Sequence, residues 1–231
     1  RRRGVFSINA LWKNKVAVLL GDFLLSRGLL LALDHKDYDL LHIVSDAVKR
    51  MSEGELLQIE KARKLDIDEE TYFRIISAKT ASLLSACTSC GARSANADES
   101  VIEIMRSFGQ ALGMAFQIRD DLFDFGVTDV GKPLGIDLKE KKMTLPLIHA
   151  LGVADPKERK RIMAIVRKNG KSKNDIRLVS RFVEDRGGID YATEKMTEFA
   201  DSARQILTSL PESASRQSLS DLVTFTISRR K

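Results

Sequence analysis

Apolar residues recur at spacings of three and four positions along nearly the whole chain, which is the period of an amphipathic helix. Short polar breaks rich in Asp, Gly or Pro separate these periodic segments. The pattern predicts a succession of helices, with a glycine-rich loop at Gly126–Gly135. The expected helices cover Ile8–Leu33, Tyr38–Arg63, a segment that follows the acidic residues Asp66–Glu70, Asp98–Phe125, a short segment around Leu147–Leu151, and three or four segments within Asp155–Arg229.

The order and length of these helices favour one helical bundle. The chain has four prolines, few β-branched runs and many Leu, Ala, Lys and Glu residues. No repeat, low-complexity tract or interdomain linker interrupts its 231 residues. Long successive helices favour nearly antiparallel packing, with a ligand site between facing helices. We therefore expect an all-α, single-domain helical bundle around a central cavity over residues 1–231.

The longest apolar run, Val16–Leu33, has the length of a membrane-spanning helix. It also contains Asp22 and Arg27, each of which costs about 2.5 to 3.5 kcal/mol at a bilayer centre. We interpret the run as a buried core helix and predict no transmembrane segment. No signal peptide is visible, and because the chain opens on Arg1 without an initiator methionine, we expect that N-terminal helices are missing.

The net charge of +6, from 38 Lys and Arg and 32 Asp and Glu residues, suits several kinds of anionic partner. Only three tyrosines and one tryptophan accompany the basic residues, so a base-stacking surface is poorly supported. We expect phosphate-bearing small molecules as ligands and no nucleic acid. Cys87 and Cys90 form a lone CxxC without a second ligand pair, so we interpret them as helix-packing residues of a cytoplasmic protein.

The stretch FQIRDDLFDFG, residues 116–126, sets polar side chains among large apolar ones. On a helix, four of them fall at i, i+3, i+4 and i+7, on one face: Gln117, Asp120, Asp121 and Asp124. A solvated outer face is the ordinary alternative, but the flanking aromatic residues place this stripe at the border of the core. Partial burial of like charges costs several kcal/mol per ion unless cations neutralise them. Because Mg²⁺ prefers carboxylates and phosphate oxygens, the stripe predicts a magnesium diphosphate site.

A metal-bridged diphosphate also needs cationic donors for its remaining oxygens. Three segments offer them: Arg1–Gly4, Lys79 with Thr80 in the middle of a helix, and the loop GKPLGIDLKEKKMTLP, which follows the aspartates. The loop lysines are Lys132, Lys139, Lys141 and Lys142. Taken singly, each of these residues is typical of an ordinary solvated surface. Together with the aspartates, they predict a diphosphate pocket.

The residues resemble those of the trans-type polyprenyl diphosphate synthase family, which includes farnesyl, geranylgeranyl and octaprenyl diphosphate synthases. FQIRDDLFD is similar to the family's second aspartate-rich motif, and RRG, GDFLLSRG, SEGELLQ, AKTASLL and GKPLGIDLKEKKMTLP match in order. The resemblance covers essentially the whole chain. It implies the isoprenoid synthase fold, a homodimer, Mg²⁺ as cofactor, and condensation of isopentenyl diphosphate with an allylic prenyl diphosphate, by ionisation, condensation and proton loss.

The resemblance also implies roles for individual residues. It makes Asp120 the main metal ligand, with Asp121 and Asp124 completing the metal-binding face directly or through water. It assigns catalysis to Lys79, Asp120 and Lys142. Residues that would bind the diphosphates are Arg2, Lys79, Thr80, Gln117 and Lys142 for the allylic substrate, Arg3 for isopentenyl diphosphate, and Lys132 as a further candidate.

One departure from the family pattern leaves alternatives open. The family's first aspartate-rich motif and its basic isopentenyl-binding residues precede RRG, and neither is present in this sequence. A non-catalytic partner subunit of a heteromeric synthase is one alternative, although the intact second motif argues against it. A terpene cyclase is another, although Arg3 and the lysine set favour condensation. The length of the product is not predicted.

Overall fold

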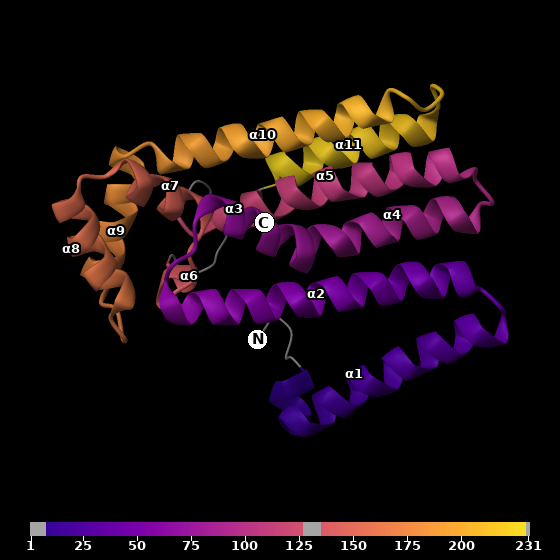
Figure 1. Cartoon of the computed structure of the whole chain (residues 1–231), viewed down its shortest axis with the longest axis horizontal. Helices are drawn as coiled ribbons and strands as arrows, with labels where there is room; N and C mark the ends of the chain where they lie inside the picture. Colours follow the sequence, from indigo (N-terminus) through magenta and orange to yellow (C-terminus); the bar gives the residue numbers. More distant parts are fainter. Residues whose placement is uncertain (1–7, 127–134, 230–231) are drawn as a thin grey trace. The chain divides into compact units, whose positions relative to one another are not determined.

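The computed structural model of the protein describes residues 8–126 and 135–229, so Arg2, Arg3 and Lys132 lie outside the described residues. Every regular element in these two ranges is helical, which confirms the all-α class (Figure 1). The elements are α1 (Ile8–Asp34), α2 (Tyr38–Lys64), α3 (Glu69–Ile76), a π-helical turn η1 (Ser77–Ala81), α4 (Ser82–Ser94), α5 (Glu99–Phe123), α6 (Ile136–Lys139), α7 (Leu145–Val153), α8 (Pro156–Arg167), α9 (Lys173–Asp185), α10 (Gly188–Leu207) and α11 (Ala214–Ser228).

The predicted helices agree closely with the observed ones. The long helices α1, α2 and α5 end within two residues of their expected limits, and four helices follow Asp155. The acidic start of α3 is also confirmed, because the Asp68 carboxylate caps the helix by accepting a hydrogen bond from the Thr71 N–H at 2.8 Å. Two features were not expected: the four-residue helix α6 within the loop, and the π-helical turn that interrupts the helix carrying Lys79.

The chain divides into two compact units, residues 1–45 and 46–231, which we describe separately. The single domain over residues 1–231 stays a prediction. In the first unit, α1 includes the apolar segment Asn14–Asp34, which is long and apolar enough to cross a membrane and has none of its residues buried. The interpretation of this segment as a buried core helix is therefore wrong. The physical reason is that this unit holds only α1 and the start of α2, too little structure to cover an apolar helix.

In the second unit, α5 lies at the centre of the core. It packs against α4 and η1 on one side and against α10 and α11 on the other (Figure 1). Ile102, Phe108, Ile118 and Leu122 of α5 are fully buried. The approach to η1 is close, because a Cβ atom added at Gly113 would overlap the backbone of Ala81. This packing brings the π-helical turn against the α5 face that carries the polar stripe.

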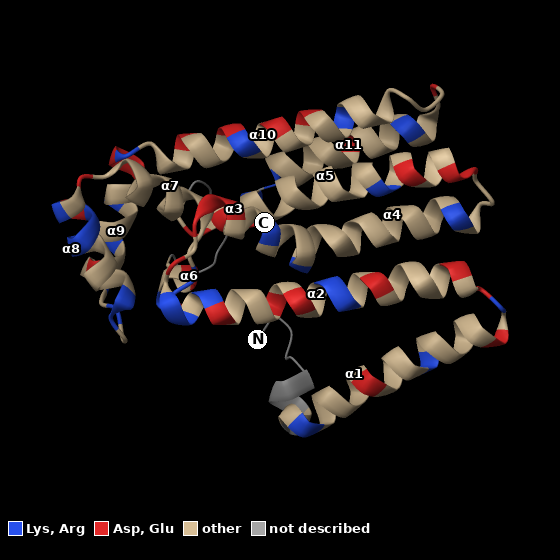
Figure 2. Cartoon of the chain, viewed as in Figure 1, with Lys and Arg blue, Asp and Glu red and all other residues tan. Residues whose placement is uncertain are grey.

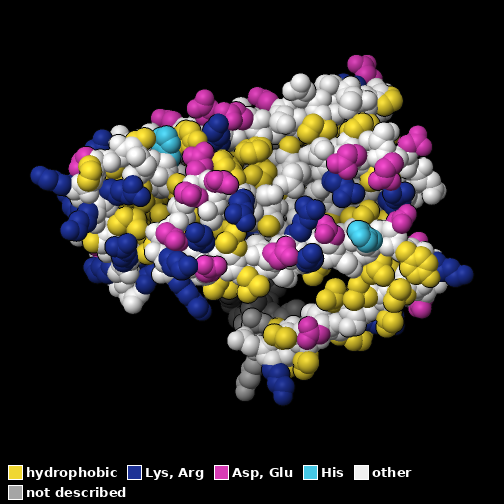
Figure 3. All heavy atoms as spheres, viewed as in Figure 1, with side chains coloured by type: hydrophobic (Ala, Val, Ile, Leu, Met, Phe, Trp, Pro, Cys, Tyr) yellow, Lys and Arg dark blue, Asp and Glu magenta, His cyan; other side chains and the backbone are white. Residues whose placement is uncertain are grey.

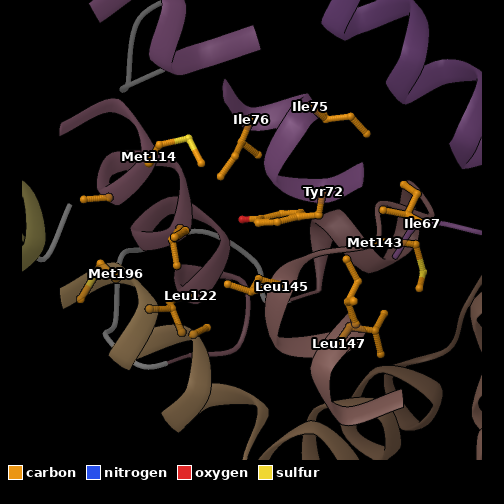
Figure 4. Close-up of a cluster of buried hydrophobic side chains, with 14 of the residues drawn as sticks. Ile67, Tyr72, Ile75, Ile76, Met114, Leu122, Met143, Leu145, Leu147 and Met196 are labelled. Atoms are coloured by element: carbon orange, nitrogen blue, oxygen red, sulfur yellow. The ribbon is translucent and has the colours of Figure 1, made fainter. Parts of the chain in front are cut away.

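The helix α3 lies next to this polar face. Its apolar side chains Tyr72, Ile75 and Ile76 are buried, together with Met143, which precedes α7, and Leu145, the first residue of α7. Figure 4 shows the Tyr72 ring within this cluster, with its hydroxyl oxygen pointing towards α5, the helix that carries Met114 and Leu122. The Tyr72 hydroxyl therefore reaches from the core to the C-terminal part of α5.

Candidate active site

The polar stripe of α5 borders the core, as the sequence predicts. None of Gln117, Asp120, Asp121 and Asp124 is fully solvated, and Asp121 has no exposed surface at all. The alternative of a charged outer face is therefore wrong. The aspartates nevertheless have three different environments, although they share one face of one helix.

Asp121 is the most enclosed of the three. Its Oδ2 accepts a hydrogen bond from the Tyr72 hydroxyl at 2.8 Å. Its Oδ1 accepts from Lys142 Nζ at 2.7 Å and from Gln117 Nε2 at 3.0 Å. Burial raises the pKa of the Asp121 carboxyl, whereas the Lys142 ammonium and the Tyr72 hydroxyl oppose that rise. Both carboxylate oxygens are thus engaged by protein donors.

Lys142 is held between two carboxylates. In addition to Asp121, it donates to Asp137 Oδ2 at 3.0 Å, and Asp137 belongs to the short helix α6. Burial lowers the pKa of Lys142, but the paired Asp121 and Asp137 more than reverse this effect and raise the pKa above its ordinary value. Lys142 is therefore a fixed, charged ammonium group.

Asp124 holds the loop that supplies Lys142. Its Oδ1 accepts hydrogen bonds from the backbone N–H groups of Ile136 at 2.7 Å and Asp137 at 3.3 Å, at the start of α6. Gly135, just before α6, has a φ of 73°, a conformation that glycine adopts without strain. Burial, and secondarily the nearby Asp137 charge, raise the pKa of Asp124. One aspartate of the motif therefore positions the segment that follows it.

Lys79 and Thr80 lie on the π-helical turn η1, in which the Ser82 N–H bonds to the Ser77 carbonyl, five residues back. The Thr80 hydroxyl donates to Gln117 Oε1 at 2.9 Å. Lys79 Nζ forms an ion pair with Glu55 at 2.5 Å and donates to Gln58 Oε1 at 3.2 Å. Glu55 and Gln58 both come from α2.

A cavity of about 120 Å³ lies beside these residues in the second unit. Its lining includes four of the predicted substrate-binding side chains: Lys79, Thr80, Gln117 and Lys142. They come from η1, α5 and the segment after α6, and the hydrogen bond between Thr80 and Gln117 joins two of them across 37 residues of chain. The cavity thus presents two ammonium groups, a hydroxyl and an amide to a ligand.

Asp120 does not line this cavity and has another partner. Its Oδ1 lies 2.7 Å from Arg229 Nη2, near the C-terminal end of the described residues. The Arg229 guanidinium also stacks 4.0 Å from the centre of the Phe116 ring. The backbone carbonyl of Arg229 accepts a hydrogen bond from Arg119 at 3.0 Å. Two aspartates of the motif form a described ion pair, and Asp120 is the more accessible of them. Its side chain is 39% exposed, whereas that of Asp121 is 0% exposed.

The donor set fits a divalent cation in part. Within residues 8–126 and 135–229, no three His, Cys, Asp or Glu side chains cluster closely enough to hold a metal ion. Mg²⁺ usually takes only one or two carboxylates and completes its shell with water and substrate phosphates. The accessible Asp120 suits that role, whereas Asp121 has both oxygens engaged. The metal-binding roles of the three aspartates stay predictions.

Several site residues were not predicted from the sequence: Glu55, Gln58, Tyr72, Asp137 and Arg229. Glu55 and Gln58 lie three positions apart within SEGELLQ, and Asp137 lies within the lysine-rich loop, so their motifs gave a usable signal. Tyr72 and Arg229 gave none, because their partners are 49 and 109 residues away in sequence.

Comparison with known proteins shows the family to which the chain belongs. A family model described as polyprenyl synthetase matches residues 1–183. The chain is 36% identical to the all-trans-nonaprenyl-diphosphate synthase (geranyl-diphosphate specific) of Rhodobacter capsulatus, over 99% of this chain and 70% of that protein. It is 32% identical to the octaprenyl diphosphate synthase of Escherichia coli, over 99% of this chain and 71% of that protein.

Solved structures are similar as well. A decaprenyl diphosphate synthase from Rhodobacter capsulatus superposes with a TM-score of 0.89 at 34% identity, covering 100% of this chain and 72% of that one. A polyprenyl synthase from Caulobacter crescentus, complexed with calcium and isoprenyl diphosphate, gives a TM-score of 0.91 at 33% identity, covering 100% and 71%.

The family match, together with the all-helical fold shared with solved prenyl synthases, places the chain in a class of enzymes that handle prenyl diphosphates. The chain belongs to the polyprenyl synthetase family, and it is a prenyltransferase that condenses isopentenyl diphosphate with an allylic diphosphate. The matches described here give no support to a non-catalytic partner subunit or to a terpene cyclase.

Proposed function

We propose that this prenyltransferase binds the diphosphate of its allylic substrate at the cavity lined by Lys79, Thr80, Gln117 and Lys142. The observation that carries the proposal is the convergence of these four side chains, from three separate segments, on one cavity. The family resemblance assigns the same four residues to the allylic diphosphate. No other contact proposed for this enzyme is supported by as many side chains from separate segments.

The two lysines would stabilise the departing diphosphate. In the condensation, the bond between the allylic carbon and the diphosphate oxygen breaks, and negative charge builds up on the leaving group. At an effective dielectric constant near 20, a unit charge about 4 Å away contributes roughly 4 kcal/mol. Lys142 is already oriented by Asp121 and Asp137, so little reorganisation is needed when charge develops.

Gln117 and Asp121 would act by positioning. The Thr80 hydroxyl donates to the Gln117 carbonyl oxygen, which leaves the Gln117 amide group directed at Asp121. Because Asp121 is buried and accepts from three side chains, we assign it to the orientation of Lys142 and Gln117 rather than to direct contact with a metal ion.

We propose Mg²⁺ as the cofactor, held mainly by Asp120, with Asp124 assisting directly or through water. When bound, the cation supplies positive charge that favours departure of the diphosphate. Support comes from the accessible Asp120 carboxylate and from two solved relatives, from Caulobacter crescentus and Corynebacterium glutamicum, that were complexed with calcium and isoprenyl diphosphate.

The remaining expectations lie outside the described residues or are untested. Arg2 is proposed to contact the allylic diphosphate, Arg3 isopentenyl diphosphate, and Lys132 one of the two. The single domain, predicted from the helix pattern, the cytoplasmic location, predicted from the two cysteines, and the homodimer, implied by the family resemblance, stay predictions.

The test is a steady-state assay of the full-length protein with Mg²⁺, farnesyl diphosphate and excess isopentenyl diphosphate, followed by sizing of the products. Lys79→Ala and Asp120→Ala should each lower kcat by about two orders of magnitude or more, the usual effect of losing one electrostatic contact to a transition state. Lys49→Ala is the matched control, because that lysine lies on α2 with its side chain 72% exposed.

Near-normal turnover of Lys79→Ala or Asp120→Ala would remove that residue from the site. A separate incubation with the allylic diphosphate alone distinguishes the alternatives. A condensing enzyme should give no product, whereas release of a hydrocarbon would identify a cyclase.

A further inference from the structure

The positive charge of the chain is concentrated in one helical hairpin. The segment Pro156–Arg186, which forms α8, α9 and their connection, holds eleven Lys and Arg residues and four Asp and Glu residues. The whole chain has a net charge of only +6, so all of its net positive charge can be attributed to this hairpin. Figure 2 shows Lys and Arg along α8, and Figure 3 shows their side chains gathered over this end of the second unit, at the left of the view.

The hairpin separates apolar from basic residues. Its inward positions are apolar and buried, such as Ile162 and Val166 on α8 and Val179 and Val183 on α9. On α9, three exposed basic residues, Lys173, Arg177 and Arg181, follow each other at intervals of four and form one stripe. The apolar face of the hairpin therefore packs in the core of the second unit, whereas the basic stripe is exposed and has no role in packing.

The stripe lines a groove of about 930 Å³ together with Lys139 of α6 and Arg161 of α8. None of these five side chains forms an ion pair with a carboxylate in the described ranges. Three carboxylates also line the groove, but Glu158 is already paired with Arg186 at 2.5 Å. The exposed side chain of Leu178 adds an apolar contact beside the stripe. The groove is open, basic and partly apolar.

We infer that the α8–α9 hairpin docks on the anionic surface of a lipid bilayer. Charge complementarity favours anionic headgroups, because a polybasic surface gains attraction with each Lys or Arg near the membrane. The hairpin contains no Tyr or Trp and its Phe182 is buried, so it has no platform for stacking nucleic-acid bases. A bilayer also matches the chemistry of the product, a lengthening hydrocarbon chain on a diphosphate, and in this respect the inference rests on the proposed function.

The experiment is co-sedimentation of the full-length protein with vesicles. Phosphatidylcholine vesicles are compared with vesicles that also contain phosphatidylglycerol. Binding should occur only to the anionic vesicles and should fall as salt is raised, since the screening length drops from about 10 Å at 0.1 M to about 3 Å at 1 M salt. The triple variant Lys173→Gln, Arg177→Gln, Arg181→Gln should lower the partition coefficient about a hundredfold.

A matched triple variant removes the same charge from α2, where Lys49, Arg50 and Lys64 are more than half exposed. Lys49→Gln, Arg50→Gln, Lys64→Gln should bind anionic vesicles within about twofold of the unmodified protein, because these residues lie outside the hairpin. An equal loss in both variants would show a simple net-charge effect and overturn the inference.

Two other results would also overturn it. Equal binding to neutral vesicles would attribute the contact to apolar surface such as α1, and tight binding of duplex DNA without vesicle binding would identify a nucleic acid as the partner. Prenyl transfer is assayed separately in solution without lipid, where both triple variants should keep normal kcat. If the unmodified protein shows no prenyl transfer but still binds anionic vesicles, the proposed function is contradicted and the docking surface stands.

Discussion

Adjacent aspartates in this enzyme differ in chemistry because one side chain points into the core and the other does not. Asp120 is partly exposed and pairs with Arg229, whereas Asp121 is fully buried and accepts from Tyr72, Gln117 and Lys142. A carboxylate whose oxygens are both engaged is held in place and in turn holds its donors. At the scale of the residue, Asp121 thus fixes the positions of Gln117 and Lys142, the two groups that we propose to face the substrate.

Tyr72→Phe tests this interpretation. The substitution removes the hydroxyl donor and leaves a buried carboxylate oxygen unsatisfied, which should destabilise the fold by about 1 to 3 kcal/mol. Urea unfolding of the purified protein measures the loss. Because Lys142 is then less firmly held, kcat should fall more than the KM for the allylic diphosphate rises.

Tyr38→Phe is the control for this experiment, since the Tyr38 side chain is exposed. It should change neither the urea midpoint nor kcat. Unchanged stability in Tyr72→Phe would show that the 2.8 Å hydrogen bond to Asp121 has no role in the fold.

At the scale of the element, the π-helical turn η1 carries Lys79 and Thr80, which both line the cavity. A π turn adds a residue to the helix, and such turns are frequent at functional sites. Here it is packed against two glycines, Gly54 of α2 and Gly113 of α5, and a Cβ atom at either would crowd residues 78 to 81. Helices α2 and α5 therefore pack closely against the π-helical turn.

Gly113→Ala should disturb this arrangement. The new methyl group overlaps Ala81, and such overpacking costs about 1 to 3 kcal/mol. Since Lys79 and Thr80 belong to the displaced turn, kcat/KM should fall even where the protein remains folded. Thermal unfolding and a steady-state assay measure the two effects.

Gly91→Ala on α4 is the matched control. A Cβ atom there meets nothing within 4 Å, so the higher helix propensity of alanine should stabilise the protein by up to about 1 kcal/mol and leave activity unchanged. Equal effects of both substitutions would contradict the role assigned to the packing at Gly113.

The helix α9 supplies a prediction about acid stability. The Asp175 carboxylate accepts from Lys168 and from Ser172 in a capping box, and these hydrogen bonds lower its pKa to about 2 from 3.8. A carboxyl whose pKa is lower in the folded state stabilises the fold above its unfolded pKa, and the contribution is lost as pH falls from about 4 to about 2. Asp175→Asn should therefore lower the midpoint of urea unfolding at pH 7. The midpoint of the variant should also fall less steeply from about pH 4 to about pH 2 than that of the unmodified protein.

Asp221→Asn provides the comparison, because the described hydrogen bond of Asp221 comes from the neutral Gln217. Its urea midpoint should follow the unmodified protein through the acid range. A parallel loss in both variants would assign the effect to net charge instead of the capping box.

At the scale of the whole molecule, stability and chemistry depend on different groups. The core of the second unit is formed by apolar side chains, and within the described ranges no cluster of acids or thiols is arranged to bind a metal by itself. A cation that binds through one or two carboxylates and substrate phosphates should require the substrate to be present.

Removal of divalent cations should therefore abolish prenyl transfer without unfolding the protein. Chelation with EDTA should leave the helical circular dichroism signal and the melting temperature unchanged. Mg²⁺ alone should raise the melting temperature little, whereas Mg²⁺ with inorganic pyrophosphate should raise it clearly, because a ligand stabilises the folded state that binds it. Loss of helical signal on chelation would show a structural metal instead.

The sequence predicted the fold more completely than the site. Helix periodicity located α1, α2 and α5 to within two residues, and the motif resemblance brought out Lys79, Thr80, Gln117 and Lys142, which share one cavity. It did not predict the exposure of α1, the π turn or the partners of the three aspartates. The spacing of polar residues along a helix does not predict which of them will be completely buried.

What the sequence by itself determined were the helices, their order and the set of polar residues on one face of α5, because these depend on neighbours within four positions. What only the tertiary structure decided was the use of each carboxylate: Asp124 for the loop, Asp121 for Tyr72 and Lys142, Asp120 for Arg229. These pairings join residues that are 12 to 109 positions apart, so they arise from the packing of whole helices and the desolvation it imposes.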